Sequence, residues 1–531
     1  MMKKLLLNLI FMLLAAVQAL AAEITIFHTN DIHCAVNEGI GVSSIAWIKQ
    51  TYKSAGLPVV LVDAGDAVQG APLGTLTQGQ AIIRLMNATE YDFAIPGNHE
   101  FDYGMESFQS LSECLACGYH SVNITKEDKP MFPQYKLMDL GGEKVAFLGV
   151  TTPQTLTSAN PVLFWDPKKP KKQLYGFMEK KTKKGVMLYQ EIQKVIDQVK
   201  QEGATKVVLV AHLGKTVDEY SVPQMLSQLT GVDAVIDGHS HEDYIDEVPD
   251  KTGKKVVVSQ TGSRLHCLGR IRLTDKGVFA DHIYQLAGTD EVVDEGLRYE
   301  FEVFNDTLMN VLGNSEFNLT IYNPLTKERL VRKQETNLGD LVADAFRVSM
   351  GTDLAVANGG GVRADIYQGT ITYRDVLSVT PFLNKLCVVN ITGKQLLDVL
   401  EFGARKYPNE FGGFLQVSGL SYTIDVRVPS SVAVDDKGYF VKVGGKRRVK
   451  DVLVGGKPLE KDKVYTLAGT EFVLRNGGDG NTLFRTLPLQ RESMLTEADA
   501  LMEYIHNRLH GVIPEEYIGY AGQGRIKIVG R

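Results

Sequence analysis

The stretch ITIFHTNDIH, residues 24–33, runs from a short apolar segment directly into Asp31 and His33. Four later stretches repeat this arrangement: VVLVDAGD at 59–66, FAIPGNHE at 93–100, VVLVAH at 207–212 and AVIDGHSH at 234–241. Each apolar run has the length and composition of a buried β-strand. Ligands of open α/β sheets bind at the carboxyl ends of the strands, so these polar residues, spread over about two hundred positions, are expected to meet in one crevice.

The polar residues that follow the predicted strands have the types needed to hold two divalent metal ions. The candidate ligands are Asp31, His33, Asp66, Asn98, His212, His239 and His241. Two ions about 3.5–4 Å apart can clamp a phosphoryl group and activate a water for in-line attack. Asp66 is the natural bridge between them, and mixed N and O ligands fit zinc, manganese, cobalt, nickel or iron. The pattern predicts a metal-dependent phosphoesterase and leaves the identity of the metals open.

The third stretch also supplies a candidate catalytic pair, His99 and Asp102. A histidine beside the metals can stabilise charge on the phosphoryl oxygens or the leaving group, and a carboxylate three residues later can fix its tautomer. We assign the attack to a metal-bound hydroxide, because no Ser or Cys has an evident base beside it. Asp63 and Glu100 are expected to form supporting hydrogen bonds, and His266, which lies outside the motifs, is expected to be an ordinary residue.

The longer strings HTNDIH at 28–33, DAGD at 63–66 and GNHEFDYG at 97–104 resemble the calcineurin-like metallophosphoesterases. The likeness is to the branch of 5′-nucleotidases, UDP-sugar hydrolases and 2′,3′-cyclic phosphodiesterases. NGGGVRADI at 358–366, TPF at 380–382 and NGGDG at 476–480 are similar to the nucleotide-recognition domain of that branch. The resemblance covers nearly the whole mature chain. It implies an α/β/β/α metallophosphoesterase sandwich followed by an α+β domain that recognises the nucleotide.

The resemblance also implies how the ligands divide between two ions. One ion would be held by Asp31, His33, Asp66 and His241, and the other by Asp66, Asn98, His212 and His239. His99 and Asp102 would be the catalytic pair. In the nucleotidase branch an amide often stands where this chain has His241.

The same resemblance assigns substrate-binding residues in the carboxyl-terminal half. It implies that Asn358 and Arg363 contact the nucleotide, that Asp479 binds the ribose, and that Phe382 and a second aromatic residue sandwich the base. Aromatic faces suit that task because stacking tolerates different bases.

Two positions depart from the family pattern. Phe472 stands seven residues before Asp479, whereas the pattern places the second aromatic six residues before it, at Val473. Either the loop has one extra residue and Phe472 stacks on the base, or Val473 occupies the position and half of the clamp is missing. The substrate arginine falls between residues 329 and 334 in an open register, and Arg332 is one candidate for it.

Length and charge agree with a two-domain enzyme. The 531 residues are too many for one core. They divide into a signal peptide at 1–21, a catalytic domain at 22–290, a linker helix at 291–316 and a substrate-binding domain at 317–531. The net charge of −6 argues against binding to a nucleic-acid polymer, which would need a basic face. The expected partner is a small nucleotide, and the sequence leaves the oligomeric state open.

The first 21 residues have the layout of a cleavable secretory signal. Lys3 and Lys4 precede an apolar stretch at 5–17, and Ala19 and Ala21 precede the expected cleavage site. The mature protein is therefore expected in the periplasm or outside the cell, without a membrane span. Five cysteines exclude a disulfide-built scaffold, and the pair at 114 and 117 is expected to be a local bridge or two packed thiols.

The leading hypothesis is an exported 5′-nucleotidase that releases a nucleoside and inorganic phosphate. A 2′,3′-cyclic-nucleotide 2′-phosphodiesterase with 3′-nucleotidase activity and a UDP-sugar hydrolase would use the same metals on other substrates. An alternative from another class is a catalytically inactive surface protein that only binds nucleotides. Intact metal ligands argue against the last, although fold alone does not prove activity.

Overall fold

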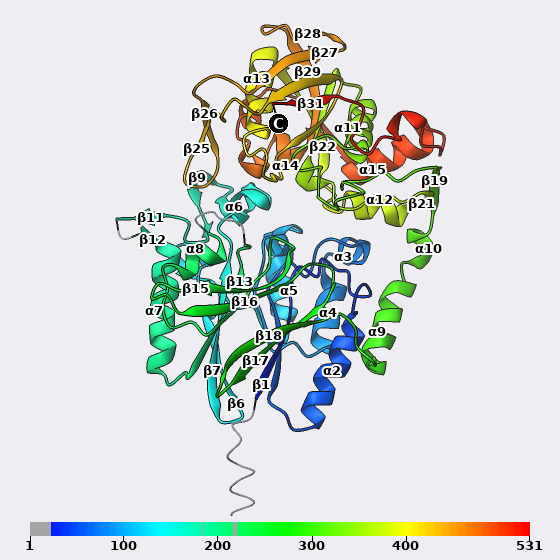
Figure 1. The fold of residues 1–531 in the computed structure, drawn as a ribbon. Helices are drawn as coiled ribbons and strands as arrows, with labels where there is room; N and C mark the ends of the chain where they lie inside the picture. Colours follow the sequence, from blue (N-terminus) through cyan, green and yellow to red (C-terminus); the bar gives the residue numbers. More distant parts are fainter. Residues whose placement is uncertain (1–22, 184, 216–219, 531) are drawn as a thin grey trace, which may run out of the picture.

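The computed structural model describes residues 23–183, 185–215 and 220–530 (Figure 1). The predicted signal peptide lies outside these residues. The chain forms two lobes, which the helices α9 (Glu291–Glu302) and α10 (Asn305–Leu308) join on one side. In the described part of the chain, no helix combines the length and the apolar character needed to cross a membrane.

The amino-terminal lobe contains two sheets that face each other. The first has the order β18 (Gly277–Ile283), β17 (Leu268–Thr274), β1 (Ile24–Thr29), β2 (Val59–Asp63) and β3 (Phe93–Ala94). The second has the order β15 (Asp243–Pro249), β16 (Lys255–Thr261), β14 (Ala234–Ile236), β13 (Lys206–His212), β7 (Glu143–Thr151) and β6 (Tyr135–Leu140). All five strands predicted from the apolar runs are present, as β1, β2, β3, β13 and β14.

Alternation along the strands builds three apolar layers. Ile26 of β1 and Val208 of β13 face the core between the sheets, whereas Phe27 and Leu209 face outward. The outer face of the first sheet is covered by α2 (Val42–Ser54), α4 (Gln80–Ala88) and α5 (Met105–Cys114), and that of the second by α7 (Met187–Gln201) and α8 (Val222–Leu226). The predicted α/β/β/α sandwich is confirmed.

Strand register brings the motif residues to one edge of the sandwich. In the first sheet, β1, β2 and β3 run parallel, with Thr29 opposite Asp63 and Asp63 opposite Ala94. In the second sheet β13 and β14 run parallel, with Val210 opposite Ile236. The chain therefore leaves all five strands at the same end, and the polar residues that follow them meet there.

The linker differs from the predicted single helix over 291–316. Helix α9 ends at Glu302, α10 covers Asn305–Leu308, and the chain then forms β19 (Val311–Ser315), which pairs with β21 (Gly369–Thr372). The residues of β19 include a valine, a glycine, an asparagine and a serine, which have low helix propensity. Pairing with β21 therefore replaces the last part of the expected helix.

The carboxyl-terminal lobe is an α+β unit, as predicted. Its larger sheet has the order β23 (Leu415–Ser418), β20 (Leu354–Asn358), β29 (Val464–Thr470), β22 (Lys385–Thr392) and β30 (Leu489–Thr496). Its smaller sheet has the order β28 (Lys457–Pro458), β27 (Val449–Val454), β24 (Leu420–Asp425) and β31 (Ile526–Val529). The helices are α11 (Asn337–Met350), α12 (Tyr373–Val379), α13 (Gly393–Gly403), α14 (Glu471–Leu474) and α15 (Glu497–Glu503).

A hairpin of the carboxyl-terminal lobe makes non-covalent contacts with the amino-terminal lobe. It consists of β25 (Val432–Val434) and β26 (Phe440–Val443), and Figure 1 shows it reaching from the upper lobe toward α6 (Thr155–Ser158). Its Tyr439 hydroxyl donates a hydrogen bond to the carbonyl oxygen of Leu156 at 3.0 Å. The Lys437 ammonium lies 3.7 Å from a carboxylate oxygen of Glu179. These contacts hold the lobes together on the side opposite the linker.

The lysine-rich stretch at residues 168–183 contains three short strands. They are β9 (Lys169–Gln173), β10 (Tyr175–Gly176) and β11 (Lys181–Thr182). The five cysteines are all free, so Cys114 and Cys117 form no bridge.

Candidate active site

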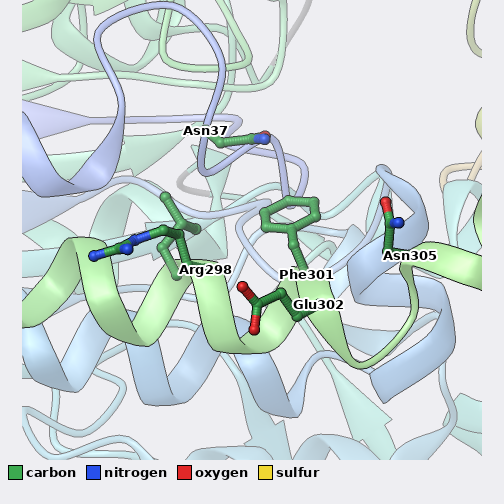
Figure 2. Close-up of a pocket in the computed structure, with 6 residues that line it drawn as sticks. Asn37, Arg298, Phe301, Glu302 and Asn305 are labelled. Carbon is green, nitrogen blue, oxygen red and sulfur yellow. The ribbon is translucent and has the colours of Figure 1, made fainter.

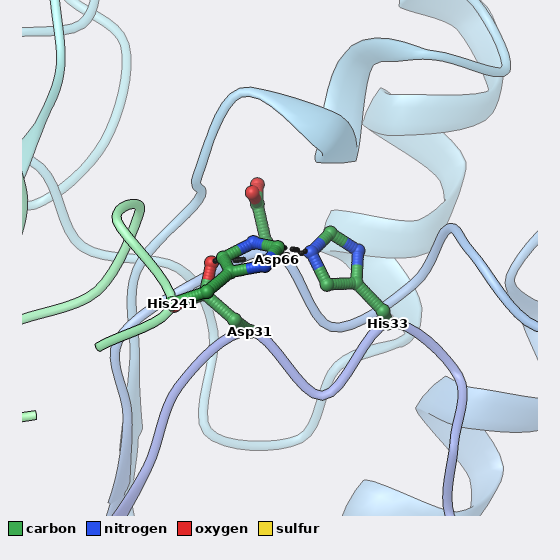
Figure 3. Close-up of side chains that lie close together, drawn as sticks. All are labelled: Asp31, His33, Asp66 and His241. Atoms are coloured by element: carbon green, nitrogen blue, oxygen red, sulfur yellow. Dashed lines mark hydrogen bonds and ion pairs between the residues drawn. The ribbon is translucent and has the colours of Figure 1, made fainter. Parts of the chain in front are cut away.

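Four of the predicted ligands form one compact group at the edge of the sandwich. Figure 3 shows Asp31, His33, Asp66 and His241, whose ligand atoms all lie within 4.8 Å of one another. The Nε2 atoms of His33 and His241 are 3.0 Å apart. Nε2 of His241 lies 3.3 Å from a carboxylate oxygen of Asp31. This grouping is the first of the two ligand sets that the resemblance implied.

A second group shares Asp66 with the first. Asp66, His212 and His239 also place their ligand atoms within 4.8 Å of one another, and Nε2 of His212 lies 3.0 Å from Asp66 Oδ2. The side-chain oxygen of Asn98 is buried and has no hydrogen-bond partner among the described residues. A buried amide oxygen without a partner is costly unless a cation or another donor meets it. The donor set therefore fits a dinuclear centre in which Asp66 is common to both ions.

Hydrogen bonds to the backbone orient two of the histidines. Nδ1 of His33 lies 2.8 Å from the carbonyl oxygen of Gln69, and Nδ1 of His212 lies 2.7 Å from that of Ala64. An Nδ1–H that donates to a carbonyl leaves the lone pair of Nε2 free for a metal. The fold thus selects the tautomer that ligation requires.

The backbone at the site is strained. Asp31, His33, Asp66, His239 and His241 all have φ between 48° and 80°. This left-handed region costs a non-glycine residue on the order of 1–3 kcal/mol, and such residues cluster at functional sites. These sharp turns direct the side chains that follow each strand into the site within a short length of chain.

Glu100 holds the loop that carries Asp66. Its carboxylate accepts hydrogen bonds from the backbone N–H groups of Asp66 and Gly97 at 2.9 and 2.6 Å, and from that of Ala67 at 2.7 Å. Burial, with the nearby charge of Asp66 second, raises the pKa of Glu100 to about 7. The predicted supporting role of Glu100 agrees with these contacts, because both of its oxygens face backbone donors.

Asn30 is a positioning residue that the motif analysis did not single out. Its side-chain amide donates to Asp31 Oδ2 and to the carbonyl oxygen of Gly262, both at 2.7 Å, and its oxygen accepts from the backbone N–H of Thr261 at 2.8 Å. Asp31 is thereby held by the loop after β16. Asn30 lies inside the quoted string, but only the contacts across the two sheets reveal its role.

The buried charged side chains of the site shift one another's pKa values. Burial would lower the pKa of His212, but the carboxylates of Asp66 and Asp31 outweigh it and raise that pKa to about 10. Burial would likewise raise the pKa of Asp66, but His212 and His99 lower it well below its usual value. A site with this much buried negative charge favours positive charge, whether from protons or from divalent ions.

The two residues of the predicted catalytic pair lie within hydrogen-bond distance of each other. Nδ1 of His99 lies 2.5 Å from Asp102 Oδ2, and the backbone N–H of His99 donates to Asp66 Oδ1 at 2.8 Å. Nε2 of His99 lies 4.0 Å from Asp66 Oδ2. Asp102 therefore orients His99 so that its Nε2 atom points toward the two groups of candidate metal ligands.

Residues of the carboxyl-terminal lobe reach the same place. The ring of Phe382 lies 5.7 Å from the ring of His99, and the Arg363 guanidinium lies 5.8 Å from the Phe382 ring. The hydroxyl of Thr75, in α3 (Pro72–Thr77), donates to the carbonyl oxygen of Pro381 at 3.1 Å and so anchors the Phe382 loop. The candidate active site thus combines residues of both lobes.

Three arginines lie near the first group of candidate metal ligands, the group that contains His241. After burial, the charges of Arg329, Arg363 and Arg332 are the main causes that lower the pKa of His241. Arg329 is paired with Glu410, with Nε 2.7 Å from a carboxylate oxygen. Nε of Arg332 has no hydrogen-bond partner within the described ranges. This contrast supports Arg332 rather than Arg329 as the arginine available to a substrate.

Two residues predicted to contact the nucleotide, Asn358 and Asp479, form a hydrogen bond with each other. The side-chain amide of Asn358 donates to Asp479 Oδ2 at 2.9 Å. Burial raises the pKa of Asp479 to about 6, and the Arg332 charge and the Asn358 hydrogen bond act against this shift. Asn358 and Asp479 come from motifs about 120 residues apart, and the structure brings them together.

The structure distinguishes Phe472 from Val473. Val473 is 2% exposed and lies in the core, whereas Phe472 is half-buried. A Cβ added to Gly478 would meet the Phe472 ring at 2.3 Å, so that ring lies directly against the NGGDG loop. Phe411 was not predicted, because it belongs to no motif, but a Cβ on Gly413 would meet both its ring and Asp479.

A separate hollow of about 270 Å³ lies along the linker (Figure 2). It is lined by Asn37, Leu297, Arg298, Phe301, Glu302 and Asn305. None of the predicted site residues contributes to it.

Known proteins share this arrangement. The family model for calcineurin-like phosphoesterases matches residues 24–243, and that for the 5′-nucleotidase C-terminal domain matches residues 312–486. The chain belongs to the 5′-nucleotidase family of metallophosphoesterases, which joins these two domains. It is a metal-dependent phosphoester hydrolase.

Particular relatives agree with this assignment. The 5′-nucleotidase of Vibrio vulnificus is 27% identical over 540 residues, which cover 91% of this chain and 90% of that protein. The trifunctional nucleotide phosphoesterase protein YfkN of Bacillus subtilis is 29% identical over 508 residues. These residues cover 87% of this chain but only 32% of that protein. The crystal structure of a 5′-nucleotidase precursor from Thermus thermophilus superposes with a TM-score of 0.80 at 26% identity, covering 96% of this chain and 100% of that one.

Proposed function

We propose that this protein is an exported 5′-nucleotidase that converts nucleoside 5′-monophosphates to nucleosides and inorganic phosphate. The observation that carries the proposal is the position of Phe382 and Arg363, which belong to the nucleotide-recognition lobe and lie beside His99 at the metal groups. A phosphate at the metal groups would have the rest of its nucleotide directed toward Asn358 and Asp479.

Each group of the site has a defined task in this proposal. Two bound divalent ions, held by the two ligand sets that share Asp66, would clamp the phosphoryl oxygens and activate a water for in-line attack. His99, oriented by Asp102, stabilises charge on the phosphoryl group or the leaving oxygen. Arg363 and Arg332 supply positive charge for the phosphate from the other lobe.

The recognition lobe positions the nucleoside. Asp479, held by Asn358, accepts hydrogen bonds from the ribose hydroxyls. Phe382 and Phe472 are the proposed faces of the base clamp, and Phe472 rather than Val473 is chosen because its ring contacts the NGGDG loop. Stacking of a base is worth about 1–3 kcal/mol and tolerates different bases.

A substrate panel tests the proposal. Phosphate release by the mature protein would be measured from 5′-AMP, 3′-AMP, 2′,3′-cyclic AMP and UDP-glucose, the last with a coupled phosphatase. The measurement is repeated after chelation and after manganese or zinc is restored. Chelator-sensitive release chiefly from 5′-AMP is expected. Preference for 2′,3′-cyclic AMP with 3′-AMP, or for UDP-glucose, would assign the second or third activity of the same family.

The inactive binding-protein alternative makes a different prediction. Such a protein would bind nucleotides without releasing phosphate under any metal condition. Two observations favour the enzyme: the buried oxygen of Asn98 has no partner in the described ranges, and two groups of candidate metal ligands share Asp66. A pure binding module does not need that arrangement. Metal analysis of the purified protein, with two ions per chain expected at these ligand sets, separates the alternatives.

Export is the remaining part of the proposal. It rests on the basic, apolar and small-residue segments of residues 1–21. Amino-terminal sequencing of the protein recovered from outside the cytoplasm should begin at Ala22. A mature protein that retains Lys3 and Lys4 in the cytoplasm would contradict export.

A further inference from the structure

A third cluster of metal-ligating side chains lies outside the proposed dinuclear site. Asp243, Cys267 and His282 place their ligand atoms within 4.8 Å of one another. Nε2 of His266 lies 3.4 Å from Asp243 Oδ2, which places a further imidazole beside this group. His266 was expected to be an ordinary residue because it belongs to no motif, but the fold gives it these neighbours.

The cluster sits where the two sheets of the sandwich meet. Asp243 begins β15 of the second sheet, whereas Cys267 immediately precedes β17 and His282 lies in β18 of the first sheet. Strand β16 packs alongside β17 and β18 at this edge. A bound ion would therefore link the two sheets.

Supporting hydrogen bonds resemble those around metal ligands. Nε2 of His282 lies 2.9 Å from the Ser259 hydroxyl, which leaves Nδ1 directed at Asp243, 2.6 Å from Oδ1. The Tyr284 hydroxyl donates to Asp243 Oδ2 at 2.9 Å. Ligating histidines typically donate their second ring N–H to such a partner, and ligating carboxylates are themselves hydrogen-bonded. Ser259 is in turn held by buried His28, with Nε2 at 2.9 Å.

We propose that Asp243, His266, Cys267 and His282 form a third metal site, with zinc as its ion. One thiolate and one carboxylate balance the charge of a divalent ion, and two imidazoles complete a tetrahedral set. The thiolate distinguishes this site from the two catalytic groups, whose ligands are nitrogen and oxygen atoms only, and shifts its preference toward zinc. The expected bond lengths are about 2.3 Å to sulfur and 2.0–2.1 Å to nitrogen.

The site has a structural consequence for the catalytic centre. Asp243 follows His241 by two residues, and the loop before Cys267 contacts Asp31 through the backbone N–H of Arg264, which donates to the carbonyl oxygen of Asp31 at 2.9 Å. Zinc at the third site would hold both loops in place. Its role is to fix the position of catalytic ligands and not to touch the substrate.

Cobalt substitution tests the site through its sulfur ligand. The full mature protein is freed of metal with a chelator and titrated with Co²⁺ while near-ultraviolet absorption is recorded. A sulfur-to-cobalt charge-transfer band is expected from the wild type and is expected to vanish in Cys267→Ser. Cys387→Ser is the matched control, because Cys387 is also buried but lies in the carboxyl-terminal lobe, and it should keep the band. A band that persists in Cys267→Ser would overturn the proposal.

Two measurements do not depend on the folding of Cys267→Ser. His266 is an exposed side chain, so His266→Ala should fold, and it should weaken cobalt binding at the sulfur site by at least about tenfold. Zinc-edge X-ray absorption of the wild-type protein loaded with zinc should detect a sulfur neighbour at about 2.3 Å, alongside three zinc ions per chain. The absence of sulfur from the zinc shell would refute the site, whatever the variants show.

Discussion

The ring of Phe382 lies 5.7 Å from the ring of His99 although the two residues belong to different lobes. His99 follows strand β3 of the catalytic sandwich, and Phe382 follows helix α12 of the recognition lobe. The Thr75 to Pro381 hydrogen bond fixes this approach. In the proposed function, the relative position of the lobes would couple catalysis at His99 to substrate recognition at Phe382. Changes at the two residues are expected to have separable kinetic effects.

Replacing His99 should reduce turnover without releasing metal. His99→Ala is expected to lower kcat by about 10²- to 10⁴-fold, the usual contribution of a positioned acid or base, with metal content unchanged. Asp102→Asn should give a smaller loss, because the imidazole remains but its orientation weakens. His510→Ala, on an exposed residue of the other lobe, is the control. Wild-type turnover in His99→Ala would move the catalytic role elsewhere.

Replacing Phe382 should mainly affect substrate binding. Phe382→Ala removes one proposed face of the base clamp and is expected to raise KM for 5′-AMP about tenfold or more. The matched control is Tyr367→Ala, which removes an aromatic ring that is 72% exposed in the same lobe. Because the base is absent from simple phosphate esters, KM for p-nitrophenyl phosphate should change less. Equal losses for both substrates would argue against base stacking.

Replacing Asn98 should remove one of the two ions. Asn98→Ala deletes the buried amide oxygen that has no protein partner in the described ranges, so the second ligand set loses a donor. We expect mass spectrometry to find about one fewer metal ion per chain and activity to fall by at least about 10²-fold. Asn98→Asp keeps an oxygen ligand and should retain more metal. Unchanged metal content in Asn98→Ala would exclude Asn98 as a ligand.

Glu497 should make stability depend on pH. It is 2% exposed, and its Oε1 accepts hydrogen bonds from the backbone and side-chain N–H groups of Asn384, both at 3.1 Å. Burial raises its pKa to about 8, while those hydrogen bonds act against the shift. The folded state therefore keeps a proton that the unfolded state loses above its ordinary pKa near 4.5. This contribution is complete below that pKa and is lost as pH rises through 8.

Glu497→Gln checks the sign of this effect. The amide cannot ionise but keeps an oxygen for Asn384, so the loss of unfolding free energy between pH 5 and pH 8 should shrink by at least about 1 kcal/mol. Denaturant unfolding at the two pH values measures it. Exposed Glu516→Gln, in the same lobe, is the control. A larger loss in Glu497→Gln than in the wild type would show that the sign is wrong.

The sequence by itself determined the five strands of the sandwich and the side chains that follow them. The strands could be predicted because a strand that is buried on both faces has an uninterrupted apolar sequence, such as Val207 to Val210. The Asp, Asn and His residues that follow these runs can bind a metal ion whatever fold surrounds them. Asp31, Asp66 and His212 could therefore be named before their distances were known.

Only the tertiary structure decided which residues meet across elements. Phe472 and Val473 are neighbours in the chain, and their roles separate only because Val473 enters the core. The approach of Phe382 to His99 depends on how two lobes dock. The cluster of Asp243, Cys267 and His282 depends on where two sheets meet. Contacts of this kind arise from packing between distant segments, for which no local pattern in a single sequence provides a signal.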